Sequence, residues 1–280
     1  MNINLCRVLG IAVLTGIFVT SLFAQQDPLV FRKGPKSKIY LAETQGESEV
    51  ISNGIVATAQ QAKAFDAPGT VIETKAKAHN AFVYSNGTGL FMEQNTRIKI
   101  DRFAQERFLP TSQNRSNPEA EPSQSQSNIV VNEGSIGICT NQLAPGSTMV
   151  YTTPVAVIDI RKGRVSIETT ATESIVDLLE GDISVRPLGG NGAGQVLRAG
   201  DRAIISASTT GVPPIVRIVP SPSESRQLLD DRTNVACNAK KTVFFDANDL
   251  AEQEITPNPT VPAKLPTNIT VSPDRLPDST

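Results

Sequence analysis

Apolar and polar residues alternate in short stretches along residues 38–219, and turn-forming residues separate these stretches. Alternation with a period of two is typical of strands that bury one face. The dipeptide Asn53-Gly54 stands between two such stretches and favours a tight hairpin turn. Further strands are expected at residues 69–74, 80–84, 90–92, 97–101, 129–131, 147–152, 155–160, 164–168, 174–179, 182–186, 194–197, 202–207 and 215–219. The pattern therefore predicts an all-β fold built from antiparallel hairpins.

A glycine, one polar residue and an apolar–x–apolar alternation recur as a short phrase in this region. The phrase begins at Gly134, Gly163 and Gly181 and, in a looser form, at Gly200. Because glycine adopts a positive φ without steric cost, each copy is expected to be a tight turn that leads into a half-buried strand. The spacings are too uneven for a solenoid of fixed period. A β-sandwich or roll is predicted, with a partly solenoid-like arrangement left open.

Residues 1–24 have the pattern of a secretory signal peptide. Arg7 precedes an almost wholly apolar run at residues 9–23, and cleavage is expected after Ala24. The run is shorter than the ~20 residues that a spanning helix needs. An uncleaved N-terminal anchor is the alternative. In both cases the rest of the chain is expected to be exported, to the periplasm or to the cell surface and exterior. After signal cleavage, no integral membrane span is expected.

Changes in composition divide the rest of the chain. Residues 25–37 are expected to be a flexible arm and residues 38–219 the β domain. Residues 107–128 are so poor in apolar side chains that burial cannot offset their ordering entropy, which predicts a polar insertion loop. Residues 220–255 are expected to form a weakly structured extension that includes a weak helix over residues 226–232. The Pro-, Asn- and Thr-rich residues 256–280 are expected to be a disordered tail.

Charge and composition narrow the classes of partner. The formal net charge of the 280-residue chain is −2, so no overall positive field draws it to nucleic acid, which is excluded as a partner. With three tyrosines and no tryptophan, the chain is also poorly supplied with the aromatic platforms on which sugars stack.

Few residues suggest chemistry. His79 is the single histidine, and no Cys or acidic residue stands near it at metal-ligand spacing, so a solvated loop histidine is favoured over a metal ligand. A Cys–His nucleophile would require the fold to bring Cys139 to that histidine. The acidic residues are scattered. No catalytic residue, metal site or cofactor is predicted, and the chain is not expected to be an enzyme.

Two further features remain open. Cys139 and Cys237 would pair in an oxidising compartment if the fold brings them together, and otherwise are two separate buried thiols. Arg161, Lys162 and Arg164 form a basic cluster at an expected turn, which either contacts an anionic partner or is simply solvated. The glycine-rich loop at residues 189–194 does not lead into a helix, so the phosphate-binding interpretation lacks its structural context.

Six short motifs within residues 38–205 occur in the order found in a known family. They lie at residues 69–74, 81–92, 129–138, 151–157, 177–185 and 196–201. In this order they resemble the FecR domain, an extracytoplasmic β-rich module of bacterial exported proteins. The resemblance implies a FecR-like β-sandwich or roll.

The chain departs from the family pattern at two points. Residues 160–165 read Ile-Arg-Lys-Gly-Arg-Val, where the family usually has Gly-Thr directly after the arginine. The family's iron-citrate regulator also has a tryptophan-rich cytoplasmic segment, which is not recognised in this sequence. The anti-sigma signalling role of that regulator is therefore not carried over.

The function expected from the sequence is that of a non-enzymatic, exported FecR-like binding or scaffold protein of the bacterial cell envelope or exterior. Its partner would be an envelope protein or a cell-surface polymer. The contact regions expected are the turn at residues 161–164, the loop at 189–194 and the insertion at 107–128. A periplasmic sensor or regulator acting through a membrane partner is the alternative, and a polysaccharide hydrolase is the least favoured function.

Overall fold

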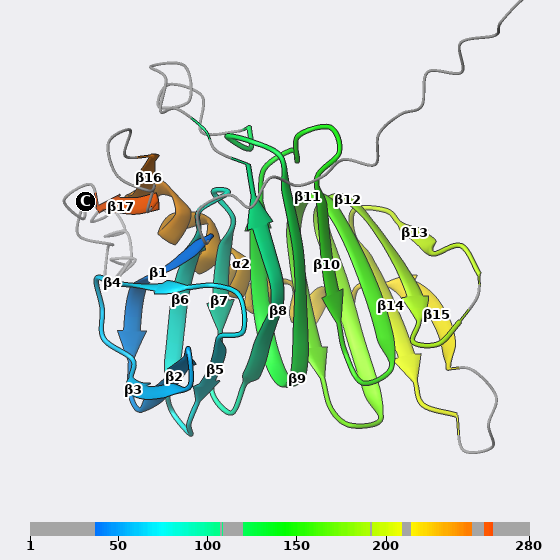
Figure 1. The fold of residues 1–280 in the computed structure, drawn as a ribbon. Helices are drawn as coiled ribbons and strands as arrows, with labels where there is room; N and C mark the ends of the chain where they lie inside the picture. The colour runs from blue at the N-terminus through cyan, green and yellow to red at the C-terminus, as the bar shows by residue number, and fades with distance from the viewer. Residues whose placement is uncertain are drawn as a thin grey trace, which may run out of the picture. The chain divides into compact units, whose positions relative to one another are not determined.

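The computed structural model describes residues 37–106, 108, 120–190, 192–208, 214–247 and 255–259, all within the unit Arg32–Thr280. Fifteen strands join in one hydrogen-bonded sheet, and β16 and β17 form a separate pair (Figure 1). The elements are β1 (Lys38–Gln45), β2 (Ser48–Ser52), β3 (Ile55–Thr58), β4 (Lys63–Asp66), β5 (Val71–Thr74), β6 (His79–Tyr84), β7 (Gly89–Met92), β8 (Arg97–Gln105), β9 (Ser125–Thr140), β10 (Thr148–Thr152), β11 (Ala156–Thr169), β12 (Glu173–Pro187), β13 (Gln195–Leu197), β14 (Asp201–Ser206), β15 (Ile215–Pro220), η1 (Ser223–Ser225), α2 (Arg226–Thr242), β16 (Val243–Ala247) and β17 (Ile255–Pro259).

The sheet folds into two layers, which share the three long strands β9, β11 and β12. The strand order of the first layer is β3-β2-β5-β8-β9-β10-β11-β12-β13. Of the long strands, this layer contains the first halves of β9 and β11 and the second half of β12. The strand order of the second layer is β4-β1-β6-β7-β9-β11-β12-β14-β15. This layer contains the second halves of β9 and β11 and the first half of β12. The β9–β10 pairing is parallel and the other ladders are antiparallel, so the mostly antiparallel all-β fold predicted from the alternation is confirmed.

The long strands change layer at glycines. Gly134, Gly163 and Gly181 lie inside β9, β11 and β12 with φ of 97°, 126° and 123°. Gly163 stands directly opposite Gly181 in the β11–β12 ladder. The prediction of hairpin turns at these three glycines is therefore wrong, because each bends a continuous strand. Gly200 (φ 89°) does lie in a turn, between β13 and β14.

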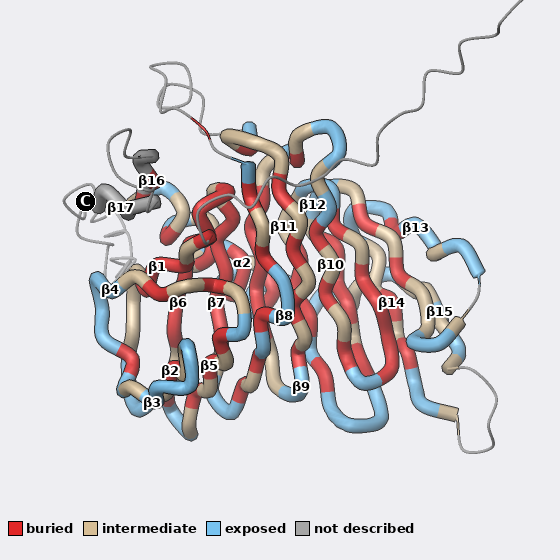
Figure 2. The backbone as a smooth tube through the Cα atoms, in the orientation of Figure 1, coloured by how far each residue is buried: buried red, intermediate tan, exposed pale blue. Residues whose placement is uncertain are grey.

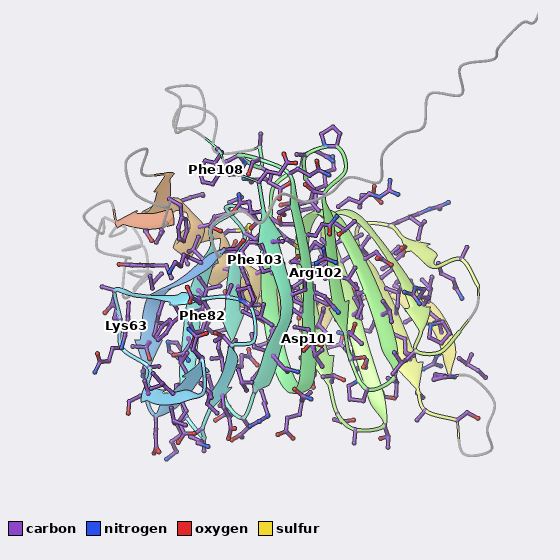
Figure 3. The ribbon with its side chains drawn as sticks, in the orientation of Figure 1. Lys63, Phe82, Asp101, Arg102, Phe103 and Phe108 are labelled. Carbon is purple, nitrogen blue, oxygen red and sulfur yellow. A yellow bond between two sulfur atoms is a disulfide. The ribbon has the colours of Figure 1, made fainter. Side chains whose placement is uncertain are left out.

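The main core lies between the two layers. It is formed by inward-facing aliphatic and aromatic side chains from nearly every strand, and Figure 2 shows the buried positions alternating with exposed ones along the strands. Phe82 of β6 and Phe103 of β8 both belong to it (Figure 3). Tyr84 meets Phe103 edge to face across the layers, with ring centroids 5.5 Å apart. The inward positions of β8, at Ile98 and Ile100, are those of the predicted alternation.

A second, smaller core lies under helix α2, which covers the outer side of the second layer behind β6 and β7 in Figure 1. The helix backbone lies directly on the strands. A Cβ atom on Gly89 would come within 2.0 Å of the Ala236 carbonyl oxygen, and one on Gly137 within 2.5 Å of the Arg232 carbonyl oxygen. Only glycine fits at these two strand positions. Residues 226–242 are thus a docked helix, which is longer than the weak helix expected over residues 226–232.

Other segments of the structure differ in part from the prediction. Residues 125–128 of the expected insertion loop belong to β9, and Ala120 forms a bridge with Gln142. Residues 255–259 form β17, so the expected disordered tail begins with a strand. The predicted signal peptide and the arm up to residue 36 lie outside the described residues. So do residues 107 and 109–119 of the insertion, residues 248–254 of the extension and the tail from residue 260.

Candidate functional site

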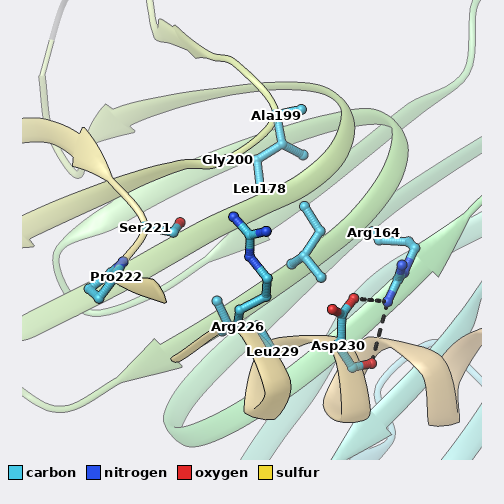
Figure 4. A pocket seen from close by; sticks show the side chains of 10 residues that line it. Arg164, Leu178, Ala199, Gly200, Ser221, Pro222, Arg226, Leu229 and Asp230 are labelled. Atoms are coloured by element: carbon cyan, nitrogen blue, oxygen red, sulfur yellow. Dashed lines mark hydrogen bonds and ion pairs between the residues drawn. The ribbon is translucent and has the colours of Figure 1, made fainter. Parts of the chain in front are cut away.

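A pocket of about 350 Å³ opens where the first turns of α2 meet the bends of β11 and β12 and the turn before β14 (Figure 4). Leu178 and Leu229 supply apolar lining. Arg164, Arg226 and Asp230 supply the charged groups, and two guanidinium groups against one carboxylate leave the lining positive.

Arg164 reaches this pocket because it follows Gly163, the residue at which β11 changes layer. Its Nη2 donates to Asp230 Oδ1 at 2.8 Å and to Thr233 Oγ1 at 2.8 Å. Its Nε is buried and has no hydrogen-bond partner among the described residues. The side chain thus ties β11 to α2 and retains an unused donor.

Arg226 is the first residue of α2 and is exposed. Figure 4 shows its side chain rising from the helix toward the turn at Gly200, with Ser221 on one side and the Arg164–Asp230 pair on the other. No hydrogen bond or ion pair of this guanidinium is found within the described part of the chain. Arginine binds carboxylates and phosphates with two parallel hydrogen bonds, so this group is suited to an anionic ligand.

One wall of the pocket is fixed by a buried carboxylate. Asp177 accepts hydrogen bonds from Ser221 Oγ at 2.7 Å and from Arg202 Nε at 2.8 Å. Because the Asp177 charge is paired in this way, the segment that carries Ser221 is held against β12 and β14. The arrangement can bind an anionic group through Arg226 beside an apolar floor.

The structure separates the three basic residues predicted to form one contact turn. The side chain of Arg161 is 76% exposed, with its Nη1 3.9 Å from Asp182 Oδ2, and Lys162 is also exposed. Arg164 lies beyond the Gly163 bend and faces the helix. Arg161 and Lys162 therefore remain available to solvent, whereas Arg164 belongs to the pocket.

The two cysteines left open by the sequence are joined. Cys139 of β9 and Cys237 of α2 form a disulfide with a Cα–Cα distance of 5.0 Å. The Cys139 sulfur is thus not available as a nucleophile. His79 lies elsewhere, with its Nε2 3.4 Å from Glu43 Oε1 and its ring against Phe91.

Two further features are absent from the described residues. In that part of the chain, no group of three or more His, Cys, Asp or Glu side chains could hold a metal ion. Nor does any helix there combine the length and apolar character needed to cross a bilayer.

Sequence reasoning missed Arg226 and Asp230 because they lie in a segment with few large apolar residues. The buried face of α2 consists of Leu229, Arg232, Thr233, Ala236 and Ala239. Their spacing of three or four residues is helical, but small and charged side chains give it little hydrophobic contrast. The spacing continues to Val243 and would have been the signal to use.

Comparison with known proteins gives little similarity in sequence. No family model matches the chain, and no curated protein matches it. Two crystal structures of a "putative anti-sigma factor" from Parabacteroides distasonis, at 2.50 and 1.65 Å resolution, match with a TM-score of 0.39 and 11% identity. Each match covers 56% of this chain and 62% of the other chain, so this chain spans less than two thirds of those structures.

Proposed function

We propose that this chain is a non-enzymatic, exported binding protein with a FecR-like β domain, which acts in the bacterial cell envelope or exterior. It holds a partner protein or polymer that presents a carboxylate to the pocket at the start of α2. The observation that carries the proposal is the Arg226 guanidinium, which is paired with no described residue and lies beside the Arg164–Asp230 pair.

Export is supported by two observations. The first residues have the pattern of a signal peptide. A disulfide joins Cys139 to Cys237, and disulfides persist mainly in oxidising compartments outside the cytosol. A binding role without catalysis is supported by the pocket lining, where one carboxylate is already ion-paired to Arg164. Glycoside hydrolysis requires two carboxyl groups that face each other across a cleft, so the hydrolase remains the least favoured function.

The test is capture of partners from envelope extract by the mature chain. Arg226→Glu reverses the charge at the pocket and is expected to lose the partner. Arg217→Glu makes the same change at an exposed position of the neighbouring strand β15 and is expected to retain it. Equal capture by both variants would show that the pocket is not the binding site.

A periplasmic sensor or regulator that signals through a membrane partner is the second candidate. It makes a distinct prediction for the same experiment. The captured partner would be an integral membrane protein, whereas a scaffold role predicts a soluble envelope protein or a polymer.

A further inference from the structure

Strand β3 lies at an edge of the first layer. Among the described residues it pairs with β2 alone, in the register Ser52↔Ile55, Ile51↔Val56 and Val50↔Ala57. The side chains of Ile55 and Val56 are 70% and 61% exposed, and β3 is among the exposed segments in Figure 2. Two adjacent aliphatic residues, one on each face of the strand, are therefore in water.

The backbone of β3 has groups that point away from the sheet and pair with no described strand. Residues Ser52 and Ile55 flank the two-residue turn and form the first hydrogen-bonded pair of the hairpin. The Ala59 amide donates to the Ser48 carbonyl at 2.8 Å, which continues the same alternation. The amide and carbonyl groups of Val56 and Thr58, between these residues, consequently face outward.

A groove of about 270 Å³ lies beside this edge, between β3 and β4. Ile55, Ala57, Val50 and Phe65 supply its apolar part, and charged and polar side chains, mostly on the β4 side, supply the rest. A strand added to β3 would continue the first layer and place alternate side chains over this groove. Burial of Ile55 and Val56 would favour the addition.

The charge pattern indicates what kind of strand fits. Residues 50–62 contain no charged side chain. The other edges are protected in the ways that natural sheets avoid association: β4 carries Lys63 and Asp66, β15 carries Arg217, and β13 has only three residues. Figure 3 shows Lys63 at the margin of the sheet. An uncharged edge matches a strand that is itself uncharged, and β3 of a second copy meets this condition.

We propose that two copies of this chain associate through antiparallel pairing of their β3 strands, with Ala57 on the twofold axis. The outward groups of Val56 then bond to those of Thr58 in the second copy, and the reverse pair forms by symmetry. Ile55 lies opposite Ala59 of the second copy. This surface is distinct from the Arg226 pocket, so the proposal does not depend on the proposed function.

The first test is sedimentation of the full mature chain over a range of concentrations. The unmodified chain is expected to form dimers. Val56→Lys places a charge at the pairing edge and is expected to give monomers. Val196→Lys makes the same change at a similarly exposed position of β13 (65% exposed) and is expected to leave the dimer intact. Monomers of the unmodified chain at every soluble concentration would overturn the proposal, as would a dimer unaffected by Val56→Lys.

A cysteine at a single position tests the register. Ala57→Cys would place two thiols opposite each other at a non-hydrogen-bonded pair, the closest pair in an antiparallel ladder. It is expected to form disulfide-linked dimers on mild oxidation. Thr58→Cys is the matched control. Thr58 lies opposite Val56 of the second copy, so the two introduced thiols would not face each other. Equal cross-linking of the two variants would contradict the register, and far-ultraviolet circular dichroism confirms that both are folded.

Discussion

The most deeply buried cation of the described chain, Arg232, fixes the helix to the strands. Its side chain is 3% exposed, and its Nε and Nη2 bind the two oxygens of Glu93 at 3.0 and 2.8 Å. Its Nη1 donates to Ser166 Oγ at 2.7 Å. Each of the three guanidinium nitrogens thus donates a hydrogen bond under α2, which makes a buried charge tolerable.

Replacement of Arg232 is expected to destabilise the protein strongly. Arg232→Ala removes three hydrogen bonds and leaves the Glu93 carboxylate, 28% exposed, without its partner. Because Glu93 keeps some access to water, we expect a loss of about 2–3 kcal/mol in the free energy of unfolding, below the value for a fully buried pair. Urea denaturation measures it. Arg161→Ala, at an exposed arginine, should change stability by less than ~0.5 kcal/mol, and equal losses would contradict this role.

Two tyrosines make the stability depend on alkaline pH. Burial raises the pKa of the Tyr84 and Tyr151 phenols well above the ordinary value of 10. Above pH 10 the unfolded chain therefore releases protons that the folded chain retains, and stability falls as the pH rises toward the folded-state pKa. Each tyrosine contributes up to ~1.4 kcal/mol per pH unit. Urea unfolding between pH 9 and 11 should show this slope, and it should flatten in the Tyr84→Phe/Tyr151→Phe variant.

At the scale of elements, the bent strands depend on paired glycines. A Cβ atom on Gly163 would lie 1.9 Å from the Glu180 carbonyl oxygen, and one on Gly181 would lie 2.1 Å from that of Lys162. These contacts come in addition to positive φ values, so two separate requirements exclude a side chain at the point where β11 and β12 change layer.

Gly163→Ala is expected to lower the free energy of unfolding by at least ~3 kcal/mol, because it combines backbone strain with a clash against a ladder carbonyl. Gly189→Ala is the matched control. Gly189 also has a positive φ, 75°, but no atom lies within 4 Å of its added Cβ. It should lose only about 1–2 kcal/mol. Similar losses in thermal or urea unfolding would show that the close approach at Gly163 does not matter.

These elements also show how far the sequence could predict the fold. The hairpin at Asn53-Gly54 is confirmed, because its turn depends on residues adjacent in sequence. A glycine within alternating residues is compatible with either a turn or a bend. At Gly163 the decision rests on Gly181 across the ladder, and nothing local records that pairing.

The candidate site was less predictable than the strands, because it also depends on contacts between residues that are far apart in sequence. Arg164 was recognised as a basic residue, but its partner Asp230 lies 66 positions away in a helix with a face of small residues. The position of Arg226 follows from that helix. Hydrophobic periodicity detects strands that fill the core between the layers better than a helix that packs by close backbone approach.

For the whole molecule, the disulfide is expected to be a large contributor to stability. Cys139 and Cys237 are 98 residues apart, so the bond restricts the unfolded chain over a long loop. The chain-entropy model gives about 4–5 kcal/mol for such a loop. Cys139→Ser/Cys237→Ser should lose this amount in urea unfolding. Reductant should lower the stability of the natural chain by the same amount and leave the variant unchanged, and any other result would contradict the assignment.

The sharing of β9, β11 and β12 between both layers has a consequence for how the molecule comes apart. In a sandwich whose strands each belong to one sheet, the two sheets are linked only by side-chain packing and loops. Here the same backbones run through both layers, so neither layer can lose its central strands while the other keeps them intact. The two layers should therefore melt in a single cooperative transition.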